Sequence, residues 1–236
     1  MTEAIWTQGD DPSRMMRYLL RHPPLHPTFR KTALLGAACA RLAWTQIDTD
    51  KVRQLIECQE KCADDPIWQD QYNALCHELV TGAEVFQQTA SAIVFAGPVL
   101  SIIEATLNVP NVSPSSVCAV MRDLFGNPFR QSQINPLWLE AGDGTVRQLA
   151  MDIYAESAFD RLPILADALE EAGCEEEILL HHFRSRDRHF RGCWAIDALL
   201  GKTDAEPDQT AWELRRTERS RSKSRRRPIA DVEEGF

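Results

Sequence analysis

Apolar residues recur along most of this chain at intervals of three and four, the spacing of a helix with one buried face. Several of these segments open with a capping residue followed by proline, which is a frequent helix start. The starts are Asp11–Pro12, Asp65–Pro66 and Ser113–Pro114. No run of alternating β-branched and polar residues is joined to another by a hairpin turn, so the pattern predicts helices and no sheet.

The spacing predicts an all-α fold, an irregular multi-helix bundle of about ten helices joined by short loops. We expect residues 1–110 to form an N-terminal helical region and residues 111–202 to form a C-terminal helical region packed with it. Within the second region, the segment 159–200 should fold as one packed unit because its apolar residues keep the helical spacing. Its expected core residues are Leu165, Leu169, Trp194 and Leu199.

A change in composition sets the last part of the chain apart. Hydrophobic residues become sparse from residue 203 onward, so we expect residues 203–236 to be a disordered basic tail. Its basic residues are Arg215, Arg216, Arg219, Arg221, Lys223, Arg225, Arg226 and Arg227. The formal net charge of the whole chain is -9, so the rest of the chain is strongly acidic. The tail could bind nucleic acid weakly and without sequence preference. The composition favours the alternative, a solvated extension that aids solubility or contacts the protein's own acidic body.

Three features bear on the cellular compartment. The N-terminal segment lacks the basic and then apolar regions of a secretory signal. The seven cysteines are an odd number, which indicates reduced thiols. The longest uncharged run, Val85–Ile103, is interrupted by Gly97–Pro98 and by polar residues, so a buried, kinked helix explains it better than a membrane span. We therefore expect a cytoplasmic protein without membrane contact.

Four parts of the chain carry a resemblance to a known family. The first is the opening, with Met1–Trp6, Asp11–Pro12, Arg30–Lys31 and Leu34–Trp44. The second is the block Arg122–Arg130, which reads RDLFGNPFR. The third is Phe159–Leu169 followed by Ala172–Cys174. The fourth is His189 with Arg191–Trp194 and Leu199–Lys202.

On these residues the chain resembles an uncharacterised helical protein family that is abundant in planctomycete bacteria. The resemblance covers most of residues 1–202 and is weaker between residues 64 and 112. The chain departs from the family at Phe183, where a cysteine is expected after His182, and in its basic tail. Because no activity is established for the family, the resemblance implies one soluble bacterial unit but no particular chemistry.

The second half contains four side chains with metal-ligand chemistry, namely Cys174, His182, His189 and Cys193. A structural zinc ion takes four such ligands in a tetrahedron, and these four could meet if the intervening turn folds back. The spacing lacks a paired C-x-x-C motif, and arginines crowd the turn at residues 184–188. We therefore expect no bound metal or other cofactor, with the two cysteines as separate packing residues.

Charged pairs near the apolar blocks offer a second kind of candidate. They are Asp160–Arg161, Asp167 and Arg122–Asp123. A carboxylate among them could act as a catalytic acid or base if burial perturbs its pKa. The pattern favours the alternative, in which these residues cap helices and form ion pairs between helices.

Taken together, the pattern favours a non-enzymatic helical protein–protein interaction module with an unknown protein partner. The alternative from another class is a hydrolase-like enzyme with a site around His182, His189 and Asp160. A third hypothesis is a nucleic-acid-associated protein that acts through the basic tail. Clustering of His182, His189 and Asp160 in a concave pocket would favour the enzyme, and their scatter over separate faces would favour the module.

Overall fold

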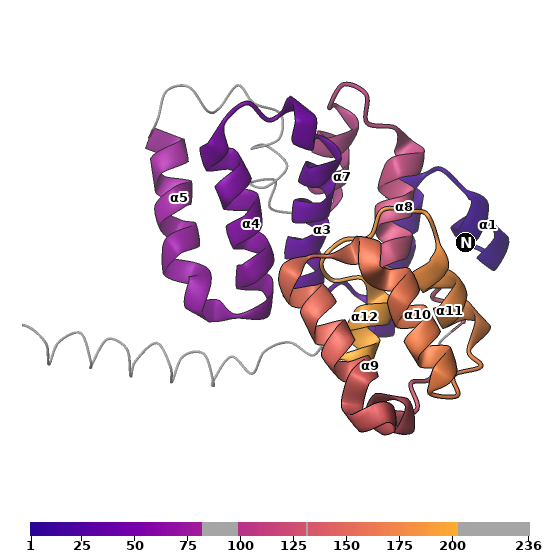
Figure 1. Cartoon of the computed structure of the whole chain (residues 1–236). Helices are drawn as coiled ribbons and strands as arrows, with labels where there is room; N and C mark the ends of the chain where they lie inside the picture. The colour runs from indigo at the N-terminus through magenta and orange to yellow at the C-terminus, as the bar shows by residue number, and fades with distance from the viewer. Residues whose placement is uncertain (82–98, 131, 203–236) are drawn as a thin grey trace, which may run out of the picture. The chain divides into compact units, whose positions relative to one another are not determined.

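The predicted all-α fold is confirmed by a computed structural model, which describes residues 1–81, 99–130 and 132–202. These residues form eleven α-helices and no strand (Figure 1). The α-helices are α1 (Glu3–Gln8), α2 (Pro12–Arg21), α3 (Phe29–Leu42), α4 (Asp50–Asp64), α5 (Gln69–Thr81), α7 (Val99–Leu107), α8 (Pro114–Phe125), α9 (Pro136–Glu156), α10 (Leu162–Glu171), α11 (Glu177–Arg184) and α12 (Trp194–Leu199). Four short 3-10 helices are η1 (Pro23–Leu25), η2 (Trp44–Gln46), η3 (Pro66–Trp68) and η4 (Phe159–Arg161).

Two expectations from the sequence concern residues outside this description. The proposed tail at 203–236 lies wholly outside the described residues, and most of the uncharged run at 85–103 does too. Within the described part of the chain, no helix has both the length and the apolar character needed to cross a membrane.

The helix starts follow the local chemistry of the sequence. The Asp11 carboxylate accepts a hydrogen bond from the backbone N–H of Arg14 at 2.8 Å, and Ser113 Oγ accepts one from Ser116 at 3.1 Å. Each bond satisfies an N–H group that the first helical turn leaves unpaired. The start at Asp65–Pro66 instead opens the 3-10 helix η3, which leads into α5.

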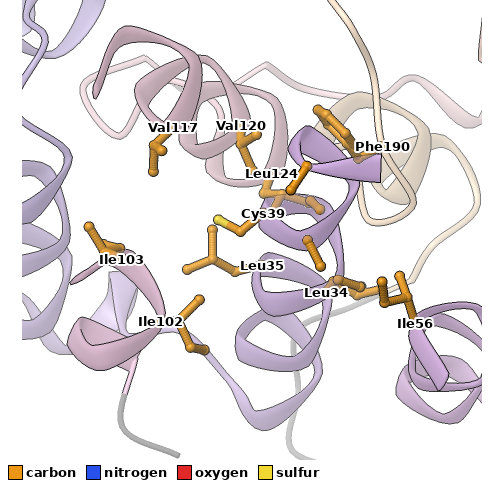
Figure 2. Packing of buried hydrophobic residues seen from close by; sticks show 14 of the residues in the cluster. Leu34, Leu35, Cys39, Ile56, Ile102, Ile103, Val117, Val120, Leu124 and Phe190 are labelled. Atoms are coloured by element: carbon orange, nitrogen blue, oxygen red, sulfur yellow. The ribbon is translucent and has the colours of Figure 1, made fainter. Parts of the chain in front are cut away.

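The first of two hydrophobic clusters forms around α3, whose residues from Leu34 to Ala40 are all buried. Helices α4, α7 and α8 pack against α3, and α2 packs against α7 and α8. Figure 2 shows Leu34, Leu35 and Cys39 of α3 among side chains from the surrounding helices, with Phe190 joining from the C-terminal part of the chain. Helix α8 therefore buries its apolar face in this first cluster, although the sequence grouped it with residues 111–202.

The second cluster is built from α9, α10, α11 and α12. The predicted core residues Leu165, Leu169 and Leu199 are buried in it. The prediction is wrong for Trp194, which is only partly buried at the edge of this cluster. Its ring lies against His182 and beneath Gly126, so it closes the edge of the cluster instead of filling the centre.

Candidate metal centre

Four side chains with metal-ligand chemistry meet where α8, α11 and the start of α12 converge. Asp123 comes from α8, His182 from α11, His189 from the loop after α11, and Cys193 from the position before α12. One potential ligand atom from each residue lies within 4.8 Å of the corresponding atoms of the other three. These four residues are called the Asp–His–His–Cys cluster below.

The contacts within the cluster centre on one carboxylate oxygen. His189 Nδ1 lies 2.7 Å from Asp123 Oδ1, and His182 Nε2 lies 3.3 Å from the same oxygen. His182 Nε2 is also 3.1 Å from the sulfur of Cys193. A single N–H at His182 Nε2 cannot donate to both the oxygen and the sulfur. Hydrogen bonds between pairs of these residues therefore do not satisfy every polar atom of the cluster.

The cluster is enclosed by protein. The side chains of Asp123 and His189 are only 4% and 5% exposed, and Cys193 is fully buried. His182 is the most accessible member, with 17% of its side chain exposed. The second ring nitrogen of His189, Nε2, is buried and has no hydrogen-bond partner among the described residues. An unpaired buried imidazole nitrogen is unusual, which sets this ring apart from a histidine held only by packing.

Burial and mutual contact set the proton affinities of the cluster. Burial acts to raise the pKa of Asp123, but its hydrogen bonds with His182 and His189 outweigh that effect and lower the pKa below its ordinary value. Asp123 is therefore a carboxylate, and His189 Nδ1–H donates to it. Burial, with the nearby charge of Asp123, raises the pKa of Cys193 well above its ordinary value. The protein alone thus keeps Cys193 as a thiol, which is a poor nucleophile.

The loop that carries two of these residues is fixed by its backbone. The N–H of Phe190 donates to the second oxygen of Asp123 at 2.8 Å. The buried ammonium group of Lys31 donates to the carbonyl oxygens of Gly192 and Leu124, each at 2.8 Å. Gly192 has a φ of +88°, and a Cβ there would lie 2.6 Å from a methyl carbon of Leu34. Only glycine fits both the conformation and the space.

A network of ion pairs adjoins the same loop through Arg191. Its Nε donates to Asp64 at 2.8 Å, and Asp64 also accepts from Arg30 and from the hydroxyl of Tyr154. Arg30 and Lys31 both bind Asp197 of α12. These groups are charged, largely buried and mutually paired, so the network serves to anchor the loop.

The arginines that counted against a cation in this region point to other partners. Arg184 pairs with Asp167 at 2.7 Å and with Glu170, both on α10. Arg188 lies over the ring of Phe190, and Arg191 binds Asp64. These three arginines thus each contact a group outside the Asp–His–His–Cys cluster, and Arg186 is exposed, which weakens the electrostatic objection raised from the sequence.

The structure brings together only part of the set that the sequence singled out. His182, His189 and Cys193 meet, whereas Cys174 is buried in the second hydrophobic cluster and is not a member of the group. Asp160, proposed as part of an enzymatic site, is exposed in η4. The carboxylate that joins the histidines is Asp123 instead.

The remaining charged candidates have structural partners. Arg161 pairs with Glu156 at 3.1 Å. Arg122 donates to the backbone carbonyl oxygens of Trp6 and Gly9, which ties α1 to α8. The eight basic residues proposed for nucleic-acid binding all lie outside the described residues.

Comparison with models of protein families, with curated proteins and with solved structures found no match to this chain. The resemblance to a planctomycete family therefore stays a prediction. The chemistry of the chain must be inferred from its own geometry.

Proposed function

We propose that this chain is a zinc-binding helical protein in which Asp123, His182, His189 and Cys193 hold the ion in a structural role. One observation carries the proposal: four potential ligand atoms from three separate parts of the fold converge within 4.8 Å in an enclosed site. Asp123 comes from α8, His182 comes from α11, and His189 and Cys193 come from the segment between α11 and α12.

The kinds of donor atom favour zinc over other common ions. Imidazole nitrogen and thiolate sulfur suit zinc, whereas calcium and magnesium are bound almost wholly by oxygen. The set provides two nitrogens, one sulfur and one carboxylate oxygen, which is the number of ligands that a tetrahedral zinc site requires.

The separations suit a tetrahedron after a small adjustment. Bonds of about 2.0–2.3 Å to zinc place neighbouring ligand atoms about 3.3–3.8 Å apart. The contacts of 2.7 and 3.1 Å are shorter than that range, the contact of 3.3 Å is at its lower limit, and the largest separation, 4.8 Å, exceeds it. The separations between ligand atoms would therefore have to change by about 1 Å at most to reach the tetrahedral range.

A site with four protein ligands is complete, so it leaves no open position for water or substrate. This supports a structural rather than a catalytic role, in keeping with the non-enzymatic interaction module that the sequence favours. The buried thiol also argues against a cysteine nucleophile, because burial keeps it protonated in the absence of a cation. Binding of zinc would displace that proton and leave a thiolate. A histidine nitrogen must likewise carry no proton to bind zinc, so His189 would bind through Nδ1 only in the tautomer protonated at Nε2.

The ion would join two parts of the fold. Asp123 lies on α8, which contributes to the first hydrophobic cluster, and Cys193 belongs to the second. A metal bond between them would hold the C-terminal helices to α8, and the binding free energy would add to the free energy of unfolding.

The test is elemental analysis of the full chain purified after expression in zinc-supplemented medium. We expect one zinc per chain, lost in Cys193→Ser. Cys174→Ser is the matched control, because Cys174 is also buried in the second cluster but lies outside the ligand group. The control should keep its zinc. Equal loss in both variants, or a wild-type chain that carries no zinc and takes up none at micromolar concentration, would refute the proposal.

A further inference from the structure

A second feature, independent of the zinc proposal, lies on the exposed side of α2. Arg14, Arg17 and Arg21 follow one another at spacings of three and four residues, so they form a stripe along one side of this helix. All three are exposed. None of their guanidinium groups forms an ion pair or a hydrogen bond with another residue of the described part of the chain. The opposite side of the helix buries Met15, Met16 and Leu19.

Aromatic rings border this stripe. The ring of Tyr18 stacks on Phe129, with ring centroids 5.3 Å apart and an angle of 21° between the planes. The ring of His22 lies 4.1 Å from Tyr18. Phe129 is 37% exposed and His22, whose ring is tilted against Tyr18, is also exposed, so both outer rings of this group reach solvent.

We propose that this surface, made of the three arginines of α2 with Tyr18, His22 and Phe129, binds single-stranded nucleic acid. Surfaces of this kind combine cations that follow the phosphate backbone with aromatic rings on which unpaired bases stack. The arginines supply unpaired positive charge, although the chain as a whole is acidic. The exposed rings supply the stacking platform.

The aromatic component selects nucleic acid over an acidic peptide. The carboxylates of an acidic peptide would satisfy the arginines, but Asp and Glu side chains have no flat ring to continue the stack of Tyr18 and Phe129. A duplex would meet the charges but would keep its bases paired and inaccessible. Single strands alone use both parts of the surface.

The test measures the fluorescence anisotropy of a labelled oligouridine and a labelled oligothymidine with the full chain at several salt concentrations. The triple variant Arg14→Gln, Arg17→Gln, Arg21→Gln should weaken binding at least tenfold. It should also reduce the slope of log K against log salt by about 2, since each lost contact to a single strand removes about 0.7. Phe129→Ala should weaken binding roughly fivefold or more and leave the salt slope unchanged, because stacking releases no counterions.

A charge-matched triple variant serves as the control. The side chains of Arg53, Arg161 and Arg184 are 37–39% exposed, and each already has a carboxylate partner. Replacing these three by glutamine changes the net charge equally and should leave binding within twofold of wild type. Circular dichroism and melting temperatures establish that all variants are folded.

The proposal is wrong if the wild-type chain does not bind the oligonucleotides at low salt, or if the two triple variants lose equal affinity. It is also wrong if the substitutions in α2 leave the affinity unchanged. That last result would place binding on the residues from Arg215 to Arg227. Displacement of the oligonucleotide by polyglutamate at equal concentration of charge would show an acidic-peptide surface instead.

Discussion

His182 and Cys193 lie eleven residues apart in the sequence, yet His182 Nε2 and Cys193 Sγ are 3.1 Å apart in the fold. The loop between α11 and α12 reverses the chain, and Asp123 of α8 approaches the same point from the first hydrophobic cluster. The predictions below follow from this convergence and from the packing that supports it.

The charge of Asp123 should be essential to metal affinity. Asp123→Asn keeps the shape of the side chain and an oxygen that can accept from Phe190, but it removes the negative charge that favours a cation. We expect zinc affinity to fall more than about tenfold, measured by competition with a chromophoric chelator. Asp160→Asn, at an exposed carboxylate outside the cluster, should leave the affinity unchanged. An affinity equal to wild type in Asp123→Asn would remove Asp123 from the ligand set.

The loop that carries His189 and Cys193 should tolerate no side chain at Gly192. Gly192→Ala would place a Cβ against Leu34 in a left-handed conformation, whereas Gly173→Ala would meet only the conformational cost because no atom lies within 4 Å. That cost alone is about 1–2 kcal/mol. We expect the Gly192 variant to lose clearly more free energy of unfolding than the Gly173 variant in urea denaturation. Equal losses would show that the close contact with Leu34 is easily relieved.

Helix α10 provides a test of the second hydrophobic cluster. Leu165 is fully buried, while its neighbour Ile164 is 57% exposed. Leu165→Ala should lower the free energy of unfolding by about 2–5 kcal/mol, because it leaves a cavity in the core. Ile164→Ala should change it by less than about 0.5 kcal/mol. Chemical denaturation of both variants measures the two losses in free energy of unfolding. Similar losses would contradict the orientation of α10, in which Leu165 faces the core and Ile164 faces solvent.

The helices were predictable because their signals are local. Capping residues, helix-initiating prolines and apolar spacing act within a few residues, and the caps at Asp11 and Ser113 were confirmed. The core positions Leu165 and Leu169 follow from the same spacing. Trp194 departs from the pattern because its position depends on Gly126, which follows the end of α8, and on His182 of α11.

The ligand cluster was only partly predictable, because it depends on contacts between distant segments. Cys174 and Cys193 each follow a glycine in the sequence, and nothing local shows that only the second meets the histidines. Asp123 stands beside Arg122, which suggested an ion pair, yet Arg122 turns to the backbone of Trp6. Asp123 reaches the histidines only because α8 packs against the loop after α11, and no sequence motif predicts that packing.

The ion-pair network around Asp64 should make the free energy of unfolding decrease at acid pH. Burial acts to raise the pKa of Asp64, but the hydrogen bond from Arg191 and the charge of Arg30 outweigh it and lower the pKa below the ordinary value of about 4. A carboxylate whose pKa is lower in the folded state stabilises the fold above its unfolded pKa, and this contribution disappears as pH falls through the folded pKa. The loss should therefore develop below about pH 4.

Replacement of this carboxylate tests that response. Asp64→Asn should be less stable than wild type at neutral pH by about 3–5 kcal/mol, because it leaves largely buried arginines without their partner. Its stability should fall less steeply below about pH 4 than that of wild type. Asp48→Asn, at an exposed position, should keep the wild-type profile. If the free energy of unfolding fell equally steeply with decreasing pH in wild type and in Asp64→Asn, Asp64 would not contribute to the acid response.

X-ray absorption at the zinc edge tests the proposed zinc site, because it counts the ligands of the metal in the full chain. A site made of Asp123, His182, His189 and Cys193 should give one sulfur at about 2.3 Å and three nitrogen or oxygen atoms at about 2.0–2.2 Å from the zinc. Cys193→Ser should remove the sulfur signal. A shell without sulfur, or one with two or more sulfurs, which would place the metal among cysteines such as Cys58, Cys62 and Cys76, would contradict a site built from Asp123, His182, His189 and Cys193.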